Sequence, residues 1–428
     1  NPAVAPKSRV SVNYYKRRCC RTPISTRFSR VSALRTLILS PWAPASAGFN
    51  EFTPLFERNQ IKLDITGGVG NNGTKTGETV VSGLYDRLSL SAGAYYYDTD
   101  GFRDNNDLKH NIQNIYGQVA ITPAFNLQVE FGNRSTDRGD LAMKGDPDDF
   151  DPTFSRNLDA TSGRVGARIS PNKDSEILLS VIYTDRDIDG TQKQELAFIP
   201  DFGAINLRSD LKSSDDTTQY DAQYIYTAES YNVVTGAAYT DVDRTDTLKF
   251  TVETPLGDDP PIKDKDDFGT YDGRAYGYAN IGMQEDFDWT VGASYTSFND
   301  GDAFDFNETS PKLGLRWSIT ELIELRGAYF EGVKPVLSAN RTLEPTQVAG
   351  FNQYFDDANG TKFKRYGIGL NWTVIPKLFL GVELTRRNLD WPTINGLTGD
   401  GDFEDRDEDL HRVYAYWTPS ERWALNAE

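Results

Sequence analysis

The stretch KLGLRW, residues 312–317, decides the fold class of this chain. Leu313, Leu315 and Trp317 are apolar there. The residues between and before them are the charged Lys312 and Arg316 and a glycine. Successive side chains of a β-strand point to opposite sides, so the alternation predicts a strand with one apolar and one polar face. The class of protein then depends on whether the polar face meets bulk water or surrounds a lumen.

The same alternation recurs along the chain from about residue 58. Clear examples are RLSLSAGAYYY (87–97), LQVEFGNR (127–134) and FLGVELTRR (379–387). Alternation over about ten residues has the length that crosses a bilayer at a tilt of about 45°. No run approaches the roughly 18 apolar residues of a membrane-spanning helix, and the mean hydropathy is −0.55. A barrel tolerates that low value, because half of each strand faces a polar interior.

Short turns separate pairs of such strands, and longer acidic connections separate the pairs. The short turns lie at 85–88, 122–125, 170–175, 227–230, 284–287, 318–321, 374–377 and 418–421. Both arms of each turn together predict about sixteen strands, and a further strand is expected at 60–70. The longer connections are expected at 98–108, 135–158, 187–214, 243–269, 299–309, 333–360 and 390–406.

The alternation of short and long connections favours a barrel over other all-β classes. Sandwich strands are usually only about five or six residues long, and propeller blades recur at a regular period of about 40–50 residues. Aromatic residues gather beside the short turns, as in the girdle of outer-membrane barrels; they are Tyr226, Trp289, Trp317, Trp372, Trp417 and Trp423. We predict an all-β chain: an antiparallel transmembrane β-barrel of about 16 strands, with short periplasmic turns and long acidic extracellular loops.

Charge is distributed unevenly over the 428 residues, whose net charge is −18. Residues 1–50 hold nine Lys or Arg and no acid, so 36 basic and 63 acidic residues leave −27 on residues 51–428. An acidic body argues against nucleic acid as a partner, because phosphates would be repelled. We predict a basic leader outside the fold at 1–48, a linker and candidate first strand at 49–70, and the barrel domain at 71–428. Because the chain does not end on the aromatic residue typical of such barrels, further C-terminal strands are expected, and the barrel is expected to be incomplete.

One aromatic-rich stretch, RTLEPTQVAGFNQYFDD (341–357), breaks the strand pattern. Together with the preceding SPKLGLRWSITELIELRGAYFEGVKP (310–335), it resembles the barrel of TonB-dependent outer-membrane receptors. More narrowly, it is similar to bacterial proteins in which such a barrel is fused to tetratricopeptide repeats. The segments at 49–59, 80–107 and 409–428 share the resemblance, which extends over roughly 49–428.

The resemblance implies a function as well as a fold. It predicts a receptor or transporter in the bacterial outer membrane that binds or passes a solute or polymer, in contact with outer-membrane lipid and lipopolysaccharide. Residues 1–48 show no helical repeat of about 34 residues, and this chain shows no plug or energy-coupling box, so TonB-type coupling would need a plug elsewhere. The alternatives are a passive porin-like or polysaccharide-export barrel without TonB coupling, and a soluble carbohydrate-binding β-protein.

A connection as long as 333–360 is usually functional or disordered. Within the receptor interpretation it lies on the exterior or folds into the lumen, where its side chains either plug the lumen by packing or contact a ligand directly. The candidate residues of this loop are Arg341, Glu344, Phe351, Asn352, Tyr354 and Phe355.

Charges of both signs lie on the polar faces of the strands. They would either filter what passes through a watery lumen or pair across strands and brace the barrel. The candidate lumen charges are Arg134, Arg168, Arg316, Arg326, Glu130 and Glu383.

Site chemistry of other kinds has little support. The acidic loop with Asp98, Asp100 and Asp104 offers oxygen ligands of the kind that Ca²⁺ prefers, although it lacks the spacing of an EF-hand and could equally be a solvated loop. The chain has only two histidines, His110 and His411, and neither belongs to a recognisable catalytic or zinc pattern. We therefore predict no enzymatic activity and no cofactor, apart from the candidate calcium ion.

Overall fold

The computed structural model describes residues 58–142, 150–199, 203–284, 286–301, 303–338, 341–394, 400–420 and 423–428. The predicted leader at 1–48 and residues 49–57 of the segment predicted as linker and first strand lie outside these ranges. Within them there is no helix long and apolar enough to cross a membrane.

β-strands make up nearly all of the described chain. The first nine are β1 Gln60–Val69, β2 Lys75–Tyr85, β3 Leu88–Thr99, β4 Leu108–Thr122, β5 Phe125–Arg138, β6 Ser155–Asn172, β7 Ser175–Ile199, β8 Gly203–Thr227 and β9 Tyr231–Thr254. The rest are β10 Gly257–Asp258, β11 Ile262–Gln284, β12 Phe287–Asp300, β13 Phe304–Thr320, β14 Ile323–Val333, β15 Gln347–Val348, β16 Phe351–Asn352, β17 Lys362–Ile375, β18 Leu378–Ile394, β19 Gly401–Ser420 and β20 Trp423–Ala427.

The strands form one antiparallel meander. Apart from β15 and β16, which make a separate hairpin, all of them belong to a single 18-stranded sheet. Without the two-residue β10, that leaves 17 long strands, each paired with the next along the chain. Sixteen of them are the arms of the eight predicted turns, and β1 is the further strand expected at 60–70. The predicted strand pattern is therefore confirmed for the described residues.

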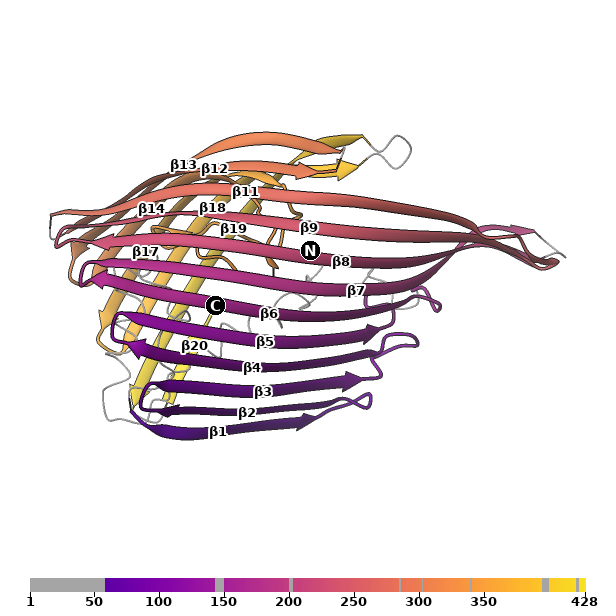
Figure 1. Ribbon diagram of the computed structural model, residues 1–428, viewed down its shortest axis with the longest axis horizontal. Coiled ribbons are helices and arrows are strands. Elements are labelled where there is room, and N and C mark those ends of the chain that lie inside the picture. Colours follow the sequence, from indigo (N-terminus) through magenta and orange to yellow (C-terminus); the bar gives the residue numbers. More distant parts are fainter. Residues whose placement is uncertain are drawn as a thin grey trace.

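The sheet curls around an interior (Figure 1). Strands β3 to β6 form one side, and β17 to β19 cross behind them on the other. The short turns gather at one end of the molecule and the longer connections at the opposite end (Figure 1). This is the arrangement of an outer-membrane barrel, in which short turns face the periplasm.

The two faces of the sheet are reversed relative to a water-soluble protein. On β5, Val129 and Phe131 point outward and are 55% and 53% exposed, whereas the preceding Gln128 points inward and is only 2% exposed. On β13, Leu313 is 46% exposed and Lys312 is 2% exposed. Apolar side chains on the outside favour a lipid surround, because water would leave this large apolar surface unburied.

Aromatic residues mark the end of the wall where the short turns lie. Trp317, Trp372, Trp417 and Trp423 are all 36% exposed or more, and each lies close to a short turn. The ring of Trp317 stacks on that of Phe287 across two strands, with centroids 5.5 Å apart. Exposed aromatic rings at one level are typical of the membrane–water boundary.

The structure corrects the predicted long loops at 187–214 and 243–269. Strands β7, β8, β9 and β11 continue through most of both ranges and reach 23 to 25 residues. They project together beyond the rest of the barrel, toward the right in Figure 1. Likewise, most of 299–309 and 390–406 belongs to strands.

These projecting strands looked like loops because charged and polar residues are frequent in them and interrupt the apolar alternation. Main-chain pairing of adjacent strands runs along them almost without interruption. Cross-strand ion pairs add to it: Arg186 pairs with Asp215, and the Lys193 Nζ lies 2.6 Å from a carboxylate oxygen of Glu253. In each pair the basic side chain is partly exposed and the carboxylate is the more buried partner.

Candidate functional site

The connection between β14 and β17, residues 334–361, folds back into the interior of the barrel. We call it the lumen loop; the structure describes it except at 339 and 340. Its two ends are tied together, because the Lys334 amide donates to the Thr361 carbonyl at 2.8 Å and the Gly360 amide donates to the Lys334 carbonyl at 2.9 Å. The prediction that this stretch lies on the exterior or inside the lumen is resolved in favour of the lumen.

The tip of the lumen loop is the small hairpin of β15 and β16. Val348 and Phe351 pair across a two-residue turn, and both are fully buried. The turn residues Ala349 and Gly350 have φ values of 46° and 86°, which is the backbone of a type I′ turn. Glycine adopts that conformation without strain, whereas alanine does so at a cost of about 1 kcal/mol.

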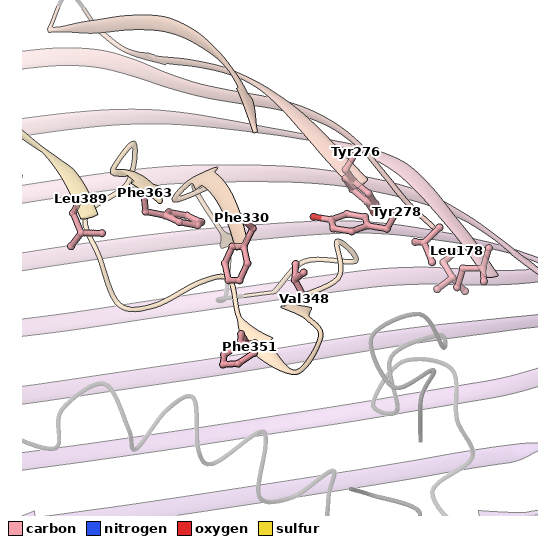
Figure 2. Packing of buried hydrophobic residues seen from close by; sticks show 10 residues of the cluster. Leu178, Tyr276, Tyr278, Phe330, Val348, Phe351, Phe363 and Leu389 are labelled. Carbon is pink, nitrogen blue, oxygen red and sulfur yellow. The ribbon is translucent and has the colours of Figure 1, made fainter. Parts of the chain in front are cut away.

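An apolar cluster surrounds this hairpin inside the barrel. Figure 2 shows Val348 and Phe351 of the lumen loop near Phe330, Phe363, Tyr276 and Tyr278, whose side chains reach inward from the wall. Leu343 and Tyr354 of the loop pack against the same cluster. The lumen loop and the wall therefore share one apolar cluster inside the barrel.

Strand β17 has glycines where the hairpin lies against it. A side chain on Gly367 would place its Cβ 2.6 Å from the ring of Phe351, and one on Gly369 would lie 3.1 Å from the guanidinium of Arg326. The two glycines therefore let a phenylalanine and an arginine lie directly against the main chain of the wall.

Arginines of the wall hold the aromatic residues of the loop. The guanidinium carbon of Arg326 lies 4.9 Å from the ring centre of Phe351. Phe355 lies against two guanidiniums, with Arg387 at 4.1 Å and Arg365 at 4.8 Å. Cation–π contacts of this kind are worth about 0.5–2 kcal/mol, with the larger values in desolvated sites.

A buried carboxyl group anchors the middle of the lumen loop. Glu344 is 2% exposed and accepts hydrogen bonds from Arg274 Nη1 at 3.0 Å and from the Tyr278 hydroxyl at 2.7 Å. Asp272, which is fully buried, lies 3.4 Å from Arg274 Nε and accepts a hydrogen bond from the Val336 amide at 2.8 Å. Charged groups tolerate such burial only when they are paired and hydrogen-bonded.

Burial also shifts the titration of groups in the lumen loop itself. It raises the pKa of the Tyr354 hydroxyl well above its ordinary value, and the nearby Glu344 raises it further. Burial lowers the pKa of Lys334, against the opposing effect of Asp357 and Asp356.

Glutamine side chains satisfy the main chain of the loop. Gln219 accepts a hydrogen bond from the Ser338 amide at 2.7 Å and donates to the Arg341 carbonyl at 2.8 Å. Gln223 donates to the carbonyl of Leu343. Within the loop, Gln353 donates to the Pro345 carbonyl at 2.6 Å. A buried loop needs such partners because its peptide groups have no water to bind.

The lumen loop reaches the opposite wall through Arg341. Both terminal nitrogens of Arg341 donate to Glu130 on β5, each at 2.8 Å, in a bidentate pair. Arg164 on β6 approaches the same carboxylate at 3.2 Å. The loop is thus held by β5 on one side and by β14, β17 and β18 on the other, so it spans the interior.

The predicted site residues fall into two groups. Arg341, Glu344, Phe351, Tyr354 and Phe355 all contact the wall or the loop's own core, while Asn352 is exposed and its carbonyl accepts a hydrogen bond from Arg365 at 2.7 Å. Three of the predicted lumen charges help to hold the loop. Glu130 pairs with Arg341 of the loop, and Arg326, which lies against Phe351 of the loop, pairs with Glu383.

The other predicted lumen charges lie in the wall. Arg168 pairs with Glu176, and Arg316 Nη2 lies 2.8 Å from Glu324. Arg134 is half-buried on β5.

Several residues of the site were not predicted as site residues. They are Tyr278, Gln219, Gln223, Gln353, Arg365 and Arg387. The available signal was a polar residue at an inward strand position, which Gln219, Gln223, Arg365 and Arg387 all satisfy. Nothing in the local sequence distinguishes them from other inward polar residues.

The predicted calcium ligands do not converge. Asp98 accepts a hydrogen bond from the Tyr96 hydroxyl at 2.7 Å, and the carboxylate of Asp100 lies against Gly73. In the described ranges, no three His, Cys, Asp or Glu side chains form a group that could hold a metal ion. Calcium binding at Asp98, Asp100 and Asp104 stays a prediction.

Comparison with known proteins agrees with this barrel. A family model described as "TonB dependent receptor-like, beta-barrel" matches residues 145–372, which is more than half of the chain. The chain belongs to this family. It is a receptor-like barrel of the bacterial outer membrane.

Solved structures share the fold at low sequence identity. The siderophore receptor PiuA from Acinetobacter baumannii matches with a TM-score of 0.64 at 9% identity, over 86% of this chain and 63% of that one. The ferripyoverdine receptor of the Pseudomonas aeruginosa outer membrane matches with a TM-score of 0.67 at 12% identity, over 88% and 56%. The ferric yersiniabactin uptake receptor FyuA from Yersinia pestis gives 0.64 at 14%, over 88% and 61%.

The receptor-like barrel therefore spans less than two thirds of the length of these structures. They are described as receptors, not as enzymes. No curated protein matches the receptor-like barrel in sequence.

Proposed function

We propose that this chain forms the wall and inner gate of an outer-membrane receptor that binds a solute and passes it across the membrane. The observation that carries the proposal is the lumen loop, which spans the interior between Glu130 on one wall and the arginines of β14, β17 and β18 on the other. Solved structures with the same fold include one described as a siderophore receptor and one described as a ferric yersiniabactin uptake receptor, and they support transport rather than catalysis.

A filled interior favours a gated receptor over an open pore. A passive porin keeps a continuous water channel, whereas here an apolar cluster with Phe330, Val348 and Phe351 occupies the interior. The porin-like or polysaccharide-export alternative would require the lumen loop to be displaced in the resting state.

Further parts of the proposal extend beyond this chain. We retain TonB-type energy coupling through a plug encoded elsewhere, fusion to tetratricopeptide repeats, and contact with lipopolysaccharide. Calcium in the acidic loop with Asp98, Asp100 and Asp104 is retained as well. Reading the coding sequence on both sides of this chain tests the plug and the repeats, and calorimetric titration with Ca²⁺ tests the metal.

Conductance across a planar bilayer tests the gated-receptor proposal. The full chain is expected to give little steady conductance, because the loop fills the lumen. A variant in which a short Gly-Ser linker replaces residues 338–358 is expected to give steady open channels. The matched control replaces residues 256–261, which contain β10 and end just before β11, and is expected to stay closed. Equal steady conductance from the full chain and the loop variant would contradict the proposal and favour the porin.

A further inference from the structure

Three arginines meet on the inner wall beside the lumen loop. Arg326 on β14, Arg365 on β17 and Arg387 on β18 have side chains only 7%, 4% and 3% exposed. Arg365 and Arg387 stand directly opposite each other in the register of their two strands. Like charges at opposed positions destabilise a sheet, so this arrangement depends on anions that lie close by.

The wall supplies only part of the negative charge. Glu383 serves two of the arginines, with Arg326 at 3.2 Å and Arg365 at 3.6 Å. Glu408 lies 2.8 Å from Arg387, but its side chain is 41% exposed. The remaining carboxylate is that of Asp357, which comes from the lumen loop and pairs with Arg387.

Some hydrogen-bonding capacity of this cluster is unused. The buried Nε atoms of Arg326 and Arg365 have no hydrogen-bond partner. A guanidinium carries five N–H donors and readily binds a carboxylate or phosphate with two of them. A buried donor without a partner is unfavourable by about 1–3 kcal/mol. The terminal nitrogens of Arg326 and Arg365 are already hydrogen-bonded, so one N–H on each guanidinium is left for a further acceptor oxygen.

The lumen loop covers the cluster with several residues, among them Phe351, whose ring lies over Arg326, and Asn352, whose carbonyl accepts from Arg365. The ring of Phe355 lies over Arg365 and Arg387, and Asp357 provides the carboxylate for Arg387. The neighbouring Asp356 is exposed, and so in part is Glu408. One edge of the cluster is therefore next to solvent.

We propose that Arg326, Arg365 and Arg387 form a binding site for the oxyanion group of an acidic solute, a phosphate or a carboxylate. Asp357 and Phe355 act as an internal substitute for that ligand, and the incoming oxyanion displaces them. The inference rests on the proposed function and adds the class of its substrate. It also gives the lumen loop a reason to move: the ligand and the loop compete for the same guanidinium groups.

Calorimetric titration of the full chain in detergent tests the site, with inorganic phosphate as the probe at constant ionic strength in chloride. Asp357→Asn removes the competing charge while keeping the shape of the side chain, and it is expected to raise phosphate affinity about tenfold. The double variant Arg365→Gln/Arg387→Gln is expected to abolish binding. The matched control, Lys364→Gln/Arg386→Gln, removes two charges from exposed residues on the outer face of the same strands, and its affinity is expected to stay within about twofold of wild type.

Two results would overturn the site: phosphate binding that survives in Arg365→Gln/Arg387→Gln, or an affinity that does not rise in Asp357→Asn. If the double variant fails to fold, as shown by loss of heat-modifiable gel mobility, the result with Asp357→Asn decides alone. Calorimetry reads binding without transport. Phosphate binding in a chain whose loop variant gives no open channels would therefore contradict the proposed function and leave the site standing. Open channels from the loop variant, without phosphate binding by the full chain, would overturn the site and leave the proposed function standing.

Discussion

Two glycines of β17 determine how closely the lumen loop approaches the wall. Gly367 lies under the ring of Phe351, and Gly369 lies under the guanidinium of Arg326 as it reaches toward Glu383. Glycine weakens a strand interior because it has no side chain to pack, so it often marks a place of close approach. In this strand the loop fills the space that the glycines leave.

Gly367→Val tests this close contact. The valine side chain would occupy the place of the Phe351 ring and push the hairpin away from the wall. We expect a loss of about 1–3 kcal/mol in loop docking, typical of overpacking, and a rise in bilayer conductance. Gly327→Val on the adjacent strand is the control, because a Cβ there meets open space, and its conductance should remain at the wild-type level. Closed channels in both variants would show that Phe351 does not hold the loop.

Glu344 is the second decisive residue, because it is the carboxylate that the loop places against the buried Arg274. Glu344→Ala would leave that guanidinium with a single close carboxylate, Asp272. Breaking a buried pair typically costs about 3–5 kcal/mol. The expected result is a lower midpoint of heat-modifiable gel mobility and easier proteolysis at Arg341. Exposed Glu229→Ala is the control, and an unchanged midpoint in Glu344→Ala would contradict the anchoring role.

At the scale of the strand, the wall depends on which face each residue occupies. Outward Val129 and inward Gln128 are neighbours in sequence, yet one is 55% exposed and the other 2% exposed. A shift by one residue would exchange the two faces along the whole strand. The register of the strand is therefore fixed by both faces, because apolar side chains must face lipid and polar side chains must face the lumen.

Val129→Arg tests the lipid-facing assignment. Arginine on the lipid face near the middle of a bilayer is unfavourable by about 2–4 kcal/mol. Folding into lipid vesicles, followed by urea titration, should show a loss of that size. Asp187→Arg, at an exposed charged position of β7, should change stability by no more than about 0.5 kcal/mol. Equal effects of the two substitutions would place Val129 in water.

The strands and turns of the wall could be predicted because their signals are local. Alternation such as Leu313, Leu315 and Trp317 reflects lipid on one side, and each short turn interrupts it with its own residues. The extension of β7 and β8 was not predicted, because frequent charged and polar residues interrupt the apolar alternation there. Strand pairing there depends on neighbours that the sequence does not reveal.

At the scale of the whole molecule, the docking of the lumen loop was beyond prediction from sequence. Arg341 meets Glu130 across 211 positions of the chain, and it meets Gln219 across 122. Contacts of such separation leave no periodic trace in the sequence. Only the aromatic content of 341–357 indicated that this segment packs against something.

The molecule as a whole combines an apolar exterior with an interior that is polar at the wall and closed by one segment. The exterior requires a lipid surround, and the interior requires a partner for its arginines and glutamines. The lumen loop is that partner in the structure. Solute passage would then require an exchange of partners at the wall rather than an opening of the strands.

Spin-label accessibility along β5 tests the central claim most directly. Single cysteines at positions 127 to 132, in a chain whose native Cys19 and Cys20 are replaced by serine, would carry a nitroxide in lipid vesicles. The account predicts that labels at Val129 and Phe131 collide with oxygen dissolved in lipid, while labels at Gln128 and Glu130 are shielded from it. Equal exposure of both sets to a water-soluble nickel complex would contradict it.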